Sequence, residues 1–290
     1  MSADVSLPLE RPAATSVQSA YLDLMKVVLT RYGLEDCDHE PAKPPARWPG
    51  FLRAALMRTL ERRGLELVRH QRVDAEVRAT GRDWPPPRSA ETMVGLKRLD
   101  NLQALISQVV QDDVPGDLVE AGVWRGGAGI FMRAVLLALG DEARSVWLAD
   151  SFQGLPPPDI ERYPVDAGDR HHTHDVLRVS RQEVESNFAR YGLLDSRVRF
   201  LEGWFADTLS TAPISQIAMM RLDGDMYGST MESLSALYPR LSVGGFVVID
   251  DYANPDIEGA RAATDDFRSR LGIVDPIQEI DWTGVFWRRT

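Results

Sequence analysis

From Asp117 onward, short apolar runs alternate with segments whose apolar residues recur every three or four positions. The short runs are typical of buried strands, and the longer period is typical of amphipathic helices. The order is strand, helix, strand, long loop, helix, then three strand–helix repeats and a terminal pair. This order predicts an α/β fold with a mostly parallel sheet covered on both faces. The segments 277–281 and 284–290 predict a closing hairpin with one antiparallel strand.

The N-terminal part of the chain predicts a helical layer. Apolar residues at helical spacing predict a helix over 16–32 and a second over 51–68 that is broken near Gly64. The proline-containing stretch 36–49 between them predicts a linker. Residues 1–15 are rich in small residues and proline, which predicts a tail without regular structure.

A further predicted helix over 91–110, capped by Ser89, leads into the sheet. The chain has 290 residues, of which 44% are hydrophobic and 26% charged, enough for one main core and an addition. We therefore expect a tail and a helical cap or lid over 1–88 and the sheet domain over 89–290.

Charge and composition restrict the classes of partner. The formal net charge of -10 argues against nucleic acid, because a phosphate backbone requires a basic face. Basic residues nevertheless outnumber acidic ones between Pro41 and Arg88, which favours a subunit contact or a solvated face over a membrane surface. No apolar run approaches a bilayer span, and the start lacks a secretory pattern. Since Cys37 is the single cysteine, we expect a cytoplasmic protein without a disulfide.

The segment 117–127, DLVEAGVWRGG, predicts a buried strand that runs into a glycine-rich turn and a helix. Gly122, Gly126 and Gly127 let the backbone approach a ligand, and the following helix directs its N-terminal amides there. Glu120 lies at the strand end in an E-x-G-x-x-x-G-G spacing, which differs from the G-x-G-x-x-G of dinucleotide-binding proteins. The turn favours S-adenosylmethionine (SAM) over NAD, although such turns also occur as plain strand–helix connections.

Acidic residues end three further predicted strands. Asp150 suits a ribose diol or caps a loop, Asp223 and Asp225 follow the next such strand, and Asp250 and Asp251 follow the last. Because the carboxyl ends of parallel strands share one edge, these acids can converge. Converging carboxylates repel one another unless a cation lies between them, and oxygen ligands favour Mg²⁺. We expect Asp223, Asp250 and Asp251 to be ligands, with a helix N-cap as the alternative role of each.

The loop over 152–180 is long enough to act as a lid. It contains three consecutive prolines and the histidines His171, His172 and His174. Their spacing, without cysteine, is unspecific for zinc. We favour substrate contact by one of them.

Six motifs, in order along the chain, resemble the macrocin O-methyltransferase (TylF/MycF/NovP) family. They are YLDLMKVVLTR, DWPPPRSAETMVGLKRLDNLQ, PGDLVEAGVWRGGAGIFMR, ADSFQGLPPP, LDGDMYGSTMESL and GGFVVIDDY. The resemblance implies a SAM- and Mg²⁺-dependent enzyme that methylates sugar hydroxyls on antibiotics. It implies a Rossmann-like class I methyltransferase domain with seven strands over 89–290, and a homo-oligomer whose N-terminal elements help to enclose the active site.

The resemblance also implies roles for single residues. Asp223, Asp250 and Asp251 resemble metal ligands, and Asp225 resembles the general base. The unperturbed pKa of a sugar hydroxyl is comparable to that of water, roughly 15.7, and a bound metal would lower it. Related catechol methyltransferases carry a lysine shortly after the first metal aspartate, whereas Gly, Asp, Met and Tyr follow Asp223 here. The alternative for Asp225 is a helix N-cap or a residue that supports a ligand.

Further positions resemble cofactor contacts. Thr92 and Met93 resemble the segment that meets the methionine end of SAM, and Gly203 and Trp204 resemble positions that flank adenine. The expected cofactor-binding residues are Thr92, Met93, Glu120, Gly122, Trp124, Asp150, Ser151, Phe152, Gly203, Trp204 and Asp223.

Three other functions remain open. A methyltransferase of catechol or phenolic acceptors would use the same cofactor and metal. A non-catalytic scaffold in a biosynthetic complex has no physical need for clustered acids, which argues against it. The glycine spacing argues against a nicotinamide oxidoreductase.

Overall fold

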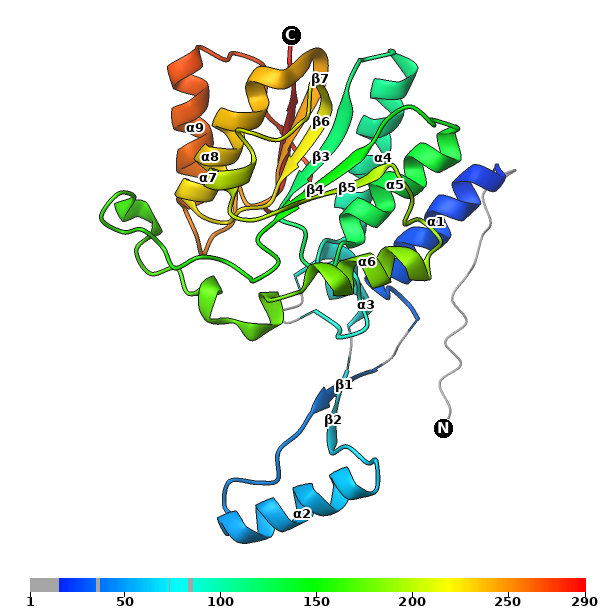
Figure 1. Cartoon of the computed structure of the whole chain (residues 1–290), viewed down its shortest axis with the longest axis vertical. Coiled ribbons are helices and arrows are strands. Elements are labelled where there is room, and N and C mark those ends of the chain that lie inside the picture. The colour runs from blue at the N-terminus through cyan, green and yellow to red at the C-terminus, as the bar shows by residue number, and fades with distance from the viewer. Residues whose placement is uncertain (1–15, 35–36, 73, 83–85) are drawn as a thin grey trace.

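A seven-stranded sheet forms the centre of the protein (Figure 1). The structure is a computed structural model that describes residues 16–34, 37–72, 74–82 and 86–290. The tail predicted over 1–15 lies outside the described residues. In spatial order the strands are β5 (Val198–Glu202), β4 (Val146–Asp150), β3 (Asp117–Ala121), β6 (Ile217–Leu222), β7 (Leu241–Ile249), β9 (Val285–Arg288) and β8 (Gln278–Glu279).

The strand directions confirm the predicted mostly parallel sheet. The neighbours from β5 to β7 pair in parallel, and β9 is antiparallel to both β7 and β8. The chain runs outward from β3 to β5 and then returns to place β6 on the other side of β3. This reversal opens a crevice beyond the carboxyl ends of β3 and β6, where open α/β sheets bind ligands.

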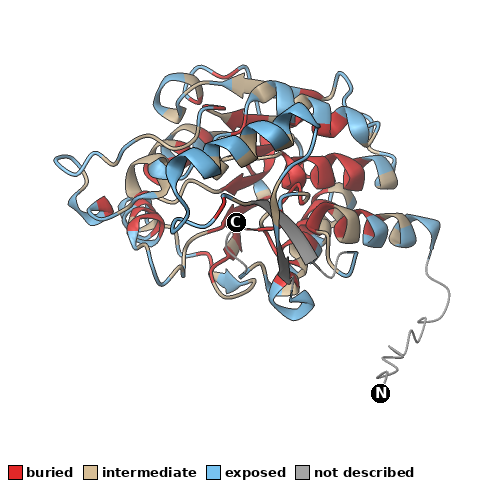
Figure 2. Cartoon of the chain, turned by 90° about the horizontal axis from the view of Figure 1, so that it is seen from below, coloured by how far each residue is buried: buried red, intermediate tan, exposed pale blue. Residues whose placement is uncertain are grey.

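Helices cover both faces of the sheet, as the element order predicts (Figure 1). Leu118 and Val119 are consecutive, fully buried residues of β3, and they belong to different core clusters because successive strand residues face opposite ways. Figure 2 shows buried residues concentrated in the sheet and on the helix sides that face it. One cluster includes α1 (Val17–Thr30), α4 (Leu96–Gln111), α5 (Gly127–Leu139) and α6 (Arg181–Arg190); the other includes α8 (Tyr227–Leu237) and α9 (Gly259–Leu271), with α7 (Phe205–Thr208) beside it.

The predicted N-terminal helices are partly confirmed. The helix expected over 16–32 is α1, whose first turn is capped by Ser16 at 3.1 Å. It packs on α5 and adds Leu22, Met25 and Leu29 to the core of the sheet domain. The helix expected from 91 begins only at Leu96, with Gly95 at its N-cap instead of Ser89.

Residues 37–72 form an arm that projects from the sheet domain (Figure 1). Its base is a pair of antiparallel strands, β1 (Cys37–Pro41) and β2 (Val68–Arg72), and its tip carries α2 (Gly50–Arg62). The linker predicted over 36–49 is therefore wrong in part, because it contains β1. The helix predicted to continue to 68 ends at Arg62, since pairing of β2 with β1 outweighs the local helical pattern.

The remaining elements connect these layers. A short helix, α3 (Ala75–Thr80), follows the arm and was not expected from the sequence. The long loop contains three single turns, η1 (Pro164–Asp166), η2 (His171–Thr173) and η3 (Asp175–Leu177), and η4 (Tyr238–Arg240) precedes β7. Within the described part of the chain, no helix has the length and apolar character needed to span a bilayer.

Candidate functional site

A cavity of about 390 Å³ lies beyond the carboxyl ends of β3, β4 and β6. This volume is within the usual range for small-molecule sites. Residues of the glycine-rich turn, of the long loop and of the loops after β5 and β6 surround it. Among the predicted cofactor residues, those that line the cavity are Met93, Gly122, Trp124, Asp150, Ser151, Trp204 and Asp223.

The glycine-rich turn after β3 brings backbone to the cavity wall. Gly122 has a φ of +91°, and a Cβ there would lie 1.9 Å from the carbonyl oxygen of Asp223. Only glycine fits this approach. The Asp150 carboxylate accepts hydrogen bonds of 2.7 Å from the N–H groups of Val123 and Phe152. Asp150 thus fixes the turn while lining the cavity, and burial raises its pKa despite these bonds.

Glu120 lies beneath the cavity rather than in its lining. Its side chain is buried, and one carboxylate oxygen accepts a 2.6 Å hydrogen bond from Arg221 on the neighbouring strand. Burial raises the pKa of Glu120 to about 8, although Arg221 opposes this shift. Its other oxygen has no hydrogen-bond partner among the residues that the structure describes.

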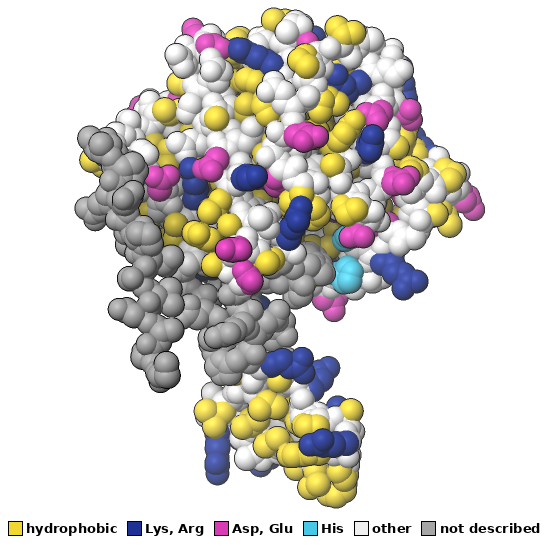
Figure 3. All heavy atoms as spheres, turned by 180° about the vertical axis from the view of Figure 1, so that it is seen from behind, with side chains coloured by type: hydrophobic (Ala, Val, Ile, Leu, Met, Phe, Trp, Pro, Cys, Tyr) yellow, Lys and Arg dark blue, Asp and Glu magenta, His cyan; other side chains and the backbone are white. Residues whose placement is uncertain are grey.

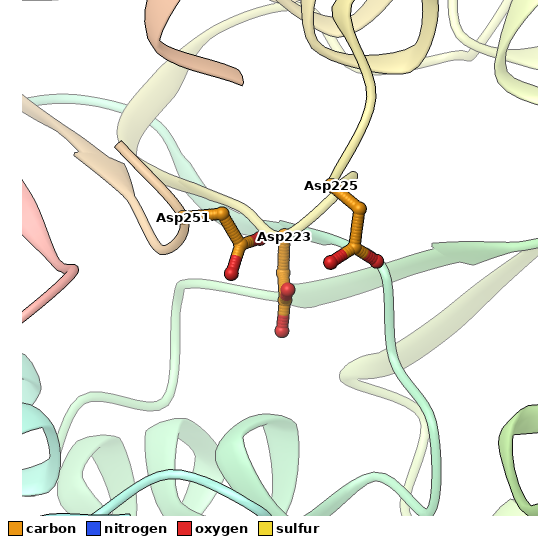
Figure 4. A group of neighbouring side chains, drawn as sticks. All are labelled: Asp223, Asp225 and Asp251. Atoms are coloured by element: carbon orange, nitrogen blue, oxygen red, sulfur yellow. The ribbon is translucent and has the colours of Figure 1, made fainter. Parts of the chain in front are cut away.

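Three carboxylates converge after β6 and β7, as Figure 4 shows. One oxygen from each of Asp223, Asp225 and Asp251 lies within 4.8 Å of the others. Asp225 has a φ of +57°, a left-handed conformation that Asp tolerates better than most residues. Burial and then Asp223 raise the pKa of Asp225 to about 7, and burial and then Asp225 raise the pKa of Asp251.

This group fits a divalent cation. The Oδ2 atom of Asp251 is buried and has no hydrogen-bond partner within the described part of the chain. Clustered oxygen donors with raised pKa values are the arrangement that a cation would stabilise. Asp223 is partly compensated by a 2.7 Å contact with Arg221. The carboxylates could thus hold Mg²⁺.

Asp250, the third ligand expected from the sequence, is outside this group. Both of its oxygens accept hydrogen bonds from Arg221, at 3.1 and 2.7 Å, and Arg98 donates to one of them. Burial raises the pKa of Asp250, but the two guanidinium groups outweigh it and hold the pKa below its usual value. In this arrangement a cation would reach Asp250 only if a guanidinium group released an oxygen.

The other predicted cofactor residues lie behind the lining. Thr92 is buried, and its hydroxyl accepts a 3.2 Å hydrogen bond from the N–H of Val94. Phe152 packs against the ring of Phe200 with centroids 6.0 Å apart. The N–H of Gly203 donates a 2.9 Å hydrogen bond to the carbonyl oxygen of Asp150 and thereby places Trp204 at the cavity.

The long loop closes one side of the cavity and is tied to the sheet domain. The indole N–H of Trp124 donates a 2.8 Å hydrogen bond to the carbonyl oxygen of Val176. The carboxylate of Asp166 accepts a 2.7 Å hydrogen bond from the N–H of Tyr227 at the start of α8. His171 contacts Asp169 at 2.9 Å, and this hydrogen bond, followed by the field of Asp225, raises the pKa of His171 to about 9.

The sequence reading missed the two arginines that hold the acids together. Arg221 is buried within β6, and Arg98 on α4 joins Asp250 to Asp281 and Thr283. A signal for Arg221 was available, because a charged residue inside an apolar strand must pair with buried acids. No comparable signal marks Arg98, since its partners follow strands far along the chain.

Comparison with known proteins identifies relatives across almost the whole chain. The profile of the family described as macrocin-O-methyltransferase (TylF) matches residues 18–289. The 8-demethyl-8-(2,3-dimethoxy-alpha-L-rhamnosyl)-tetracenomycin-C 4'-O-methyltransferase of Streptomyces olivaceus is 60% identical over 218 residues, which are 75% of this chain and 82% of that protein. The demethyldecarbamoylnovobiocin O-methyltransferase of Streptomyces niveus is 50% identical over 219 residues, 74% of this chain and 81% of that protein.

The solved structure of the O-methyltransferase NovP is similar in fold. It superposes with a TM-score of 0.79 at 43% sequence identity, and the match covers 94% of this chain and 99% of that chain. The similarity therefore includes the sheet, its helices and the cavity region.

Proposed function

The chain belongs to the macrocin O-methyltransferase (TylF) family, and from this premise we propose that it methylates a sugar hydroxyl of a glycosylated natural product. It is a SAM-dependent O-methyltransferase with the class I methyltransferase fold. The observation that carries the proposal is the meeting of the glycine-rich turn with Asp223 and Asp225 at one cavity, where Asp251 adds a third carboxylate beside them. A methyl donor and a metal-bound acceptor need such adjacent sites.

The turn after β3 and the strand end of β4 fit the cofactor. Because Gly122 has no Cβ, the backbone of the turn can form the cavity wall directly. Asp150 stabilises the conformation of the turn through its hydrogen bond with Val123, and its carboxylate suits the ribose hydroxyls of SAM. Met93 and Trp204 line the cavity at positions suited to the methionine and adenine ends. Bound there, SAM would supply an electrophilic methyl group.

Asp223 and Asp251 are the residues that we propose as ligands of Mg²⁺. They belong to the converging group, and the unpartnered oxygen of Asp251 supports this assignment. Asp250 remains a predicted ligand that requires release of an oxygen by Arg98 or Arg221. Bound there, Mg²⁺ would lower the pKa of a coordinated hydroxyl.

Asp225 is the proposed general base. Its carboxylate lies beside those of Asp223 and Asp251, and a pKa of about 7 suits proton transfer near neutral pH. Its left-handed backbone turns the side chain toward the other two acids, as Figure 4 shows. Asp225 would accept the proton of the hydroxyl group as the oxygen attacks the methyl carbon.

The acceptor would lie under the long loop. Pro156, Pro157 and Tyr163 line the cavity from that loop, and the ring of Tyr163 packs against that of Tyr227 at a tilt of 35°, with centroids 5.0 Å apart. These apolar and aromatic surfaces suit the faces of a sugar ring and its aglycone. The name of the Streptomyces olivaceus relative specifies a rhamnosyl-bearing acceptor, which supports a glycoside over a simple catechol.

We also propose that the enzyme is a homo-oligomer that forms through the arm. No residue of α2 is buried, and Trp48, Phe51, Leu52 and Leu65 are exposed by 42% to 72%. Apolar side chains gathered on the arm are visible in Figure 3. Residues 37–72 hold eight basic and four acidic residues, a net charge of +4, so the chain total of -10 leaves -14 elsewhere. A basic, apolar arm suits the acidic body of a second copy.

The experiment that tests the function compares acceptor classes. The full-length protein is incubated with SAM, Mg²⁺ and either demethylated antibiotic glycosides or catechols, and products are measured by mass spectrometry. Equal formation of methylated glycoside and S-adenosylhomocysteine supports the proposal. Methylation of catechols alone would favour the phenolic alternative, and absence of SAM binding would favour a scaffold.

A separate experiment tests the proposed role of the arm in oligomerisation. Light scattering should show that Phe51→Ser with Leu52→Ser dissociates the oligomer, whereas Val274→Ser, at a position 90% exposed outside the arm, does not.

A further inference from the structure

One wall of the cavity is the segment 91–94, which lies between two supports. Met93 lines the cavity, and its neighbours Thr92 and Val94 are buried. On one side, the N–H of Gly127 donates a 2.9 Å hydrogen bond to the carbonyl oxygen of Glu91. A Cβ on Gly127 would lie 2.4 Å from that oxygen, so the wall packs directly on the start of α5.

Arg78 supports the other side of the wall. Its side chain extends from α3 and is fully buried. Its Nη2 atom donates hydrogen bonds of 2.8 Å to the carbonyl oxygen of Met93 and 3.0 Å to that of Val94. Bonds from a charged donor are roughly twice as strong as neutral ones. The guanidinium group therefore fixes the orientation of two consecutive peptide groups at the cavity.

Close backbone packing holds α3 in place for this role. A Cβ on Gly81, after α3, would lie 2.6 Å from the backbone nitrogen of Gly95. A Cβ on Gly95 would lie 2.5 Å from the carbonyl oxygen of Ala79. The indole N–H of Trp282 also donates a 3.1 Å hydrogen bond to the carbonyl oxygen of Thr80. The helix that carries Arg78 is thus in direct contact with the wall it orients.

We infer that Arg78 is a positioning residue for SAM, which it affects through the peptide groups of Met93 and Val94. The inference rests on the proposed function, in which Met93 meets the methionine end of the cofactor. Arg78 acts on the shape of the binding wall through the carbonyl groups of Met93 and Val94, whereas the three proposed acceptor-side carboxylates follow β6 and β7. Its loss should weaken SAM binding equally in the ground and transition states, which raises KM for SAM and leaves kcat unchanged.

The test is calorimetric titration of full-length variants with S-adenosylhomocysteine. Arg78→Met should weaken binding by about tenfold or more, because two charge-assisted hydrogen bonds are lost. Arg78→Lys keeps a charged donor but loses the planar guanidinium group, so it should bind about threefold more weakly than the unsubstituted protein, a smaller loss than that of Arg78→Met. The matched control is Arg289→Met. Arg289 also donates from one Nη atom to two backbone carbonyls, those of Tyr238 and Leu241. Leu241 begins β7, so these carbonyls lie at the amino ends of the parallel strands, whereas the cavity lies at their carboxyl ends.

The outcomes separate this inference from the proposed function. If the unsubstituted protein does not bind S-adenosylhomocysteine, the proposed function fails. If it binds and Arg78→Met binds equally well, or if Arg289→Met weakens binding as much, the positioning role is overturned. Should Arg78→Met fail to fold, steady-state kinetics of Arg78→Lys decide: a raised KM for SAM with unchanged kcat supports the role, and an unchanged KM overturns it.

Discussion

Arg221 and Glu120 lie directly opposite each other on the parallel strands β6 and β3, and the guanidinium group donates a 2.6 Å hydrogen bond to the carboxylate. The same guanidinium group contacts Asp223 and Asp250, each at 2.7 Å. One buried guanidinium group therefore compensates Glu120 beneath the glycine-rich turn and two acids, Asp223 and Asp250, that follow β6 and β7. The region beneath the glycine-rich turn and the acids that follow β6 and β7 therefore depend on the same positive charge.

Arg221→Met should lower the free energy of unfolding by about 3–5 kcal/mol, because removing one partner leaves buried carboxylates without compensation. Urea denaturation at neutral pH measures this loss. The control is Arg199→Met, at an exposed position on β5, which should change stability by less than about 0.5 kcal/mol. Equal stability of the two variants would show that Arg221 does not compensate the buried acids.

Asp225→Asn should reduce kcat by about 10²–10⁴-fold, since the variant cannot accept the hydroxyl proton. Asn tolerates the left-handed backbone at this position, so the substitution separates charge from conformation. Affinity for S-adenosylhomocysteine, measured by calorimetry, should remain within about threefold of the unsubstituted protein. Loss of cofactor binding would instead assign Asp225 a structural role.

Asp251→Asn and Asp250→Asn test the ligand assignment together. Asp251→Asn should raise the Mg²⁺ concentration for half-maximal activity by about tenfold or more, because it removes a charged ligand. If Asp250 also binds the metal, Asp250→Asn should do the same. A lower melting temperature of Asp250→Asn with an unchanged Mg²⁺ response would limit Asp250 to its contacts with Arg98 and Arg221.

His171 should make the stability of the long loop depend on pH. Its contact with Asp169 raises the pKa of His171 from 6.5 to about 9, and Asp225 and Asp223 also favour the charged form. A raised pKa in the folded state means that the stabilisation is complete below about pH 6.5 and is lost as the pH rises through about 9.

The free energy of unfolding of the unsubstituted protein should exceed that of His171→Gln most at about pH 6.5 and least above pH 9. Denaturation in urea at several pH values gives the difference. A difference that stays constant across this range would exclude an ion pair between His171 and Asp169. The test needs neither cofactor nor metal.

The sheet was predictable because each strand and helix carries its own local pattern. Leu118 and Val119 face opposite core clusters, and such continuous apolar runs identify strands buried on both faces. The arm was not predictable in the same way. The strands β1 and β2 form only when residues about thirty positions apart pair, so local helical and linker patterns gave a wrong assignment.

The site residues also divide into those that local sequence patterns predict and those that depend on long-range pairing. The strand-end positions of Asp223 and Asp251 follow from the element order, and the structure brings these carboxylates together. The partners of Asp250 do not follow from it, because Arg98 reaches Asp250 across 152 positions of sequence. Long-range pairing of this kind depends on how α4 packs on the sheet, which local pattern does not contain.

The most direct test of the proposed function is transfer of an isotopically labelled methyl group from SAM to a demethylated antibiotic glycoside, with and without Mg²⁺. We expect label on a sugar oxygen of the product, one equivalent of S-adenosylhomocysteine per methyl transferred, and loss of transfer when the metal is chelated. Label on the aglycone alone, or transfer that is unchanged by chelation, would contradict it.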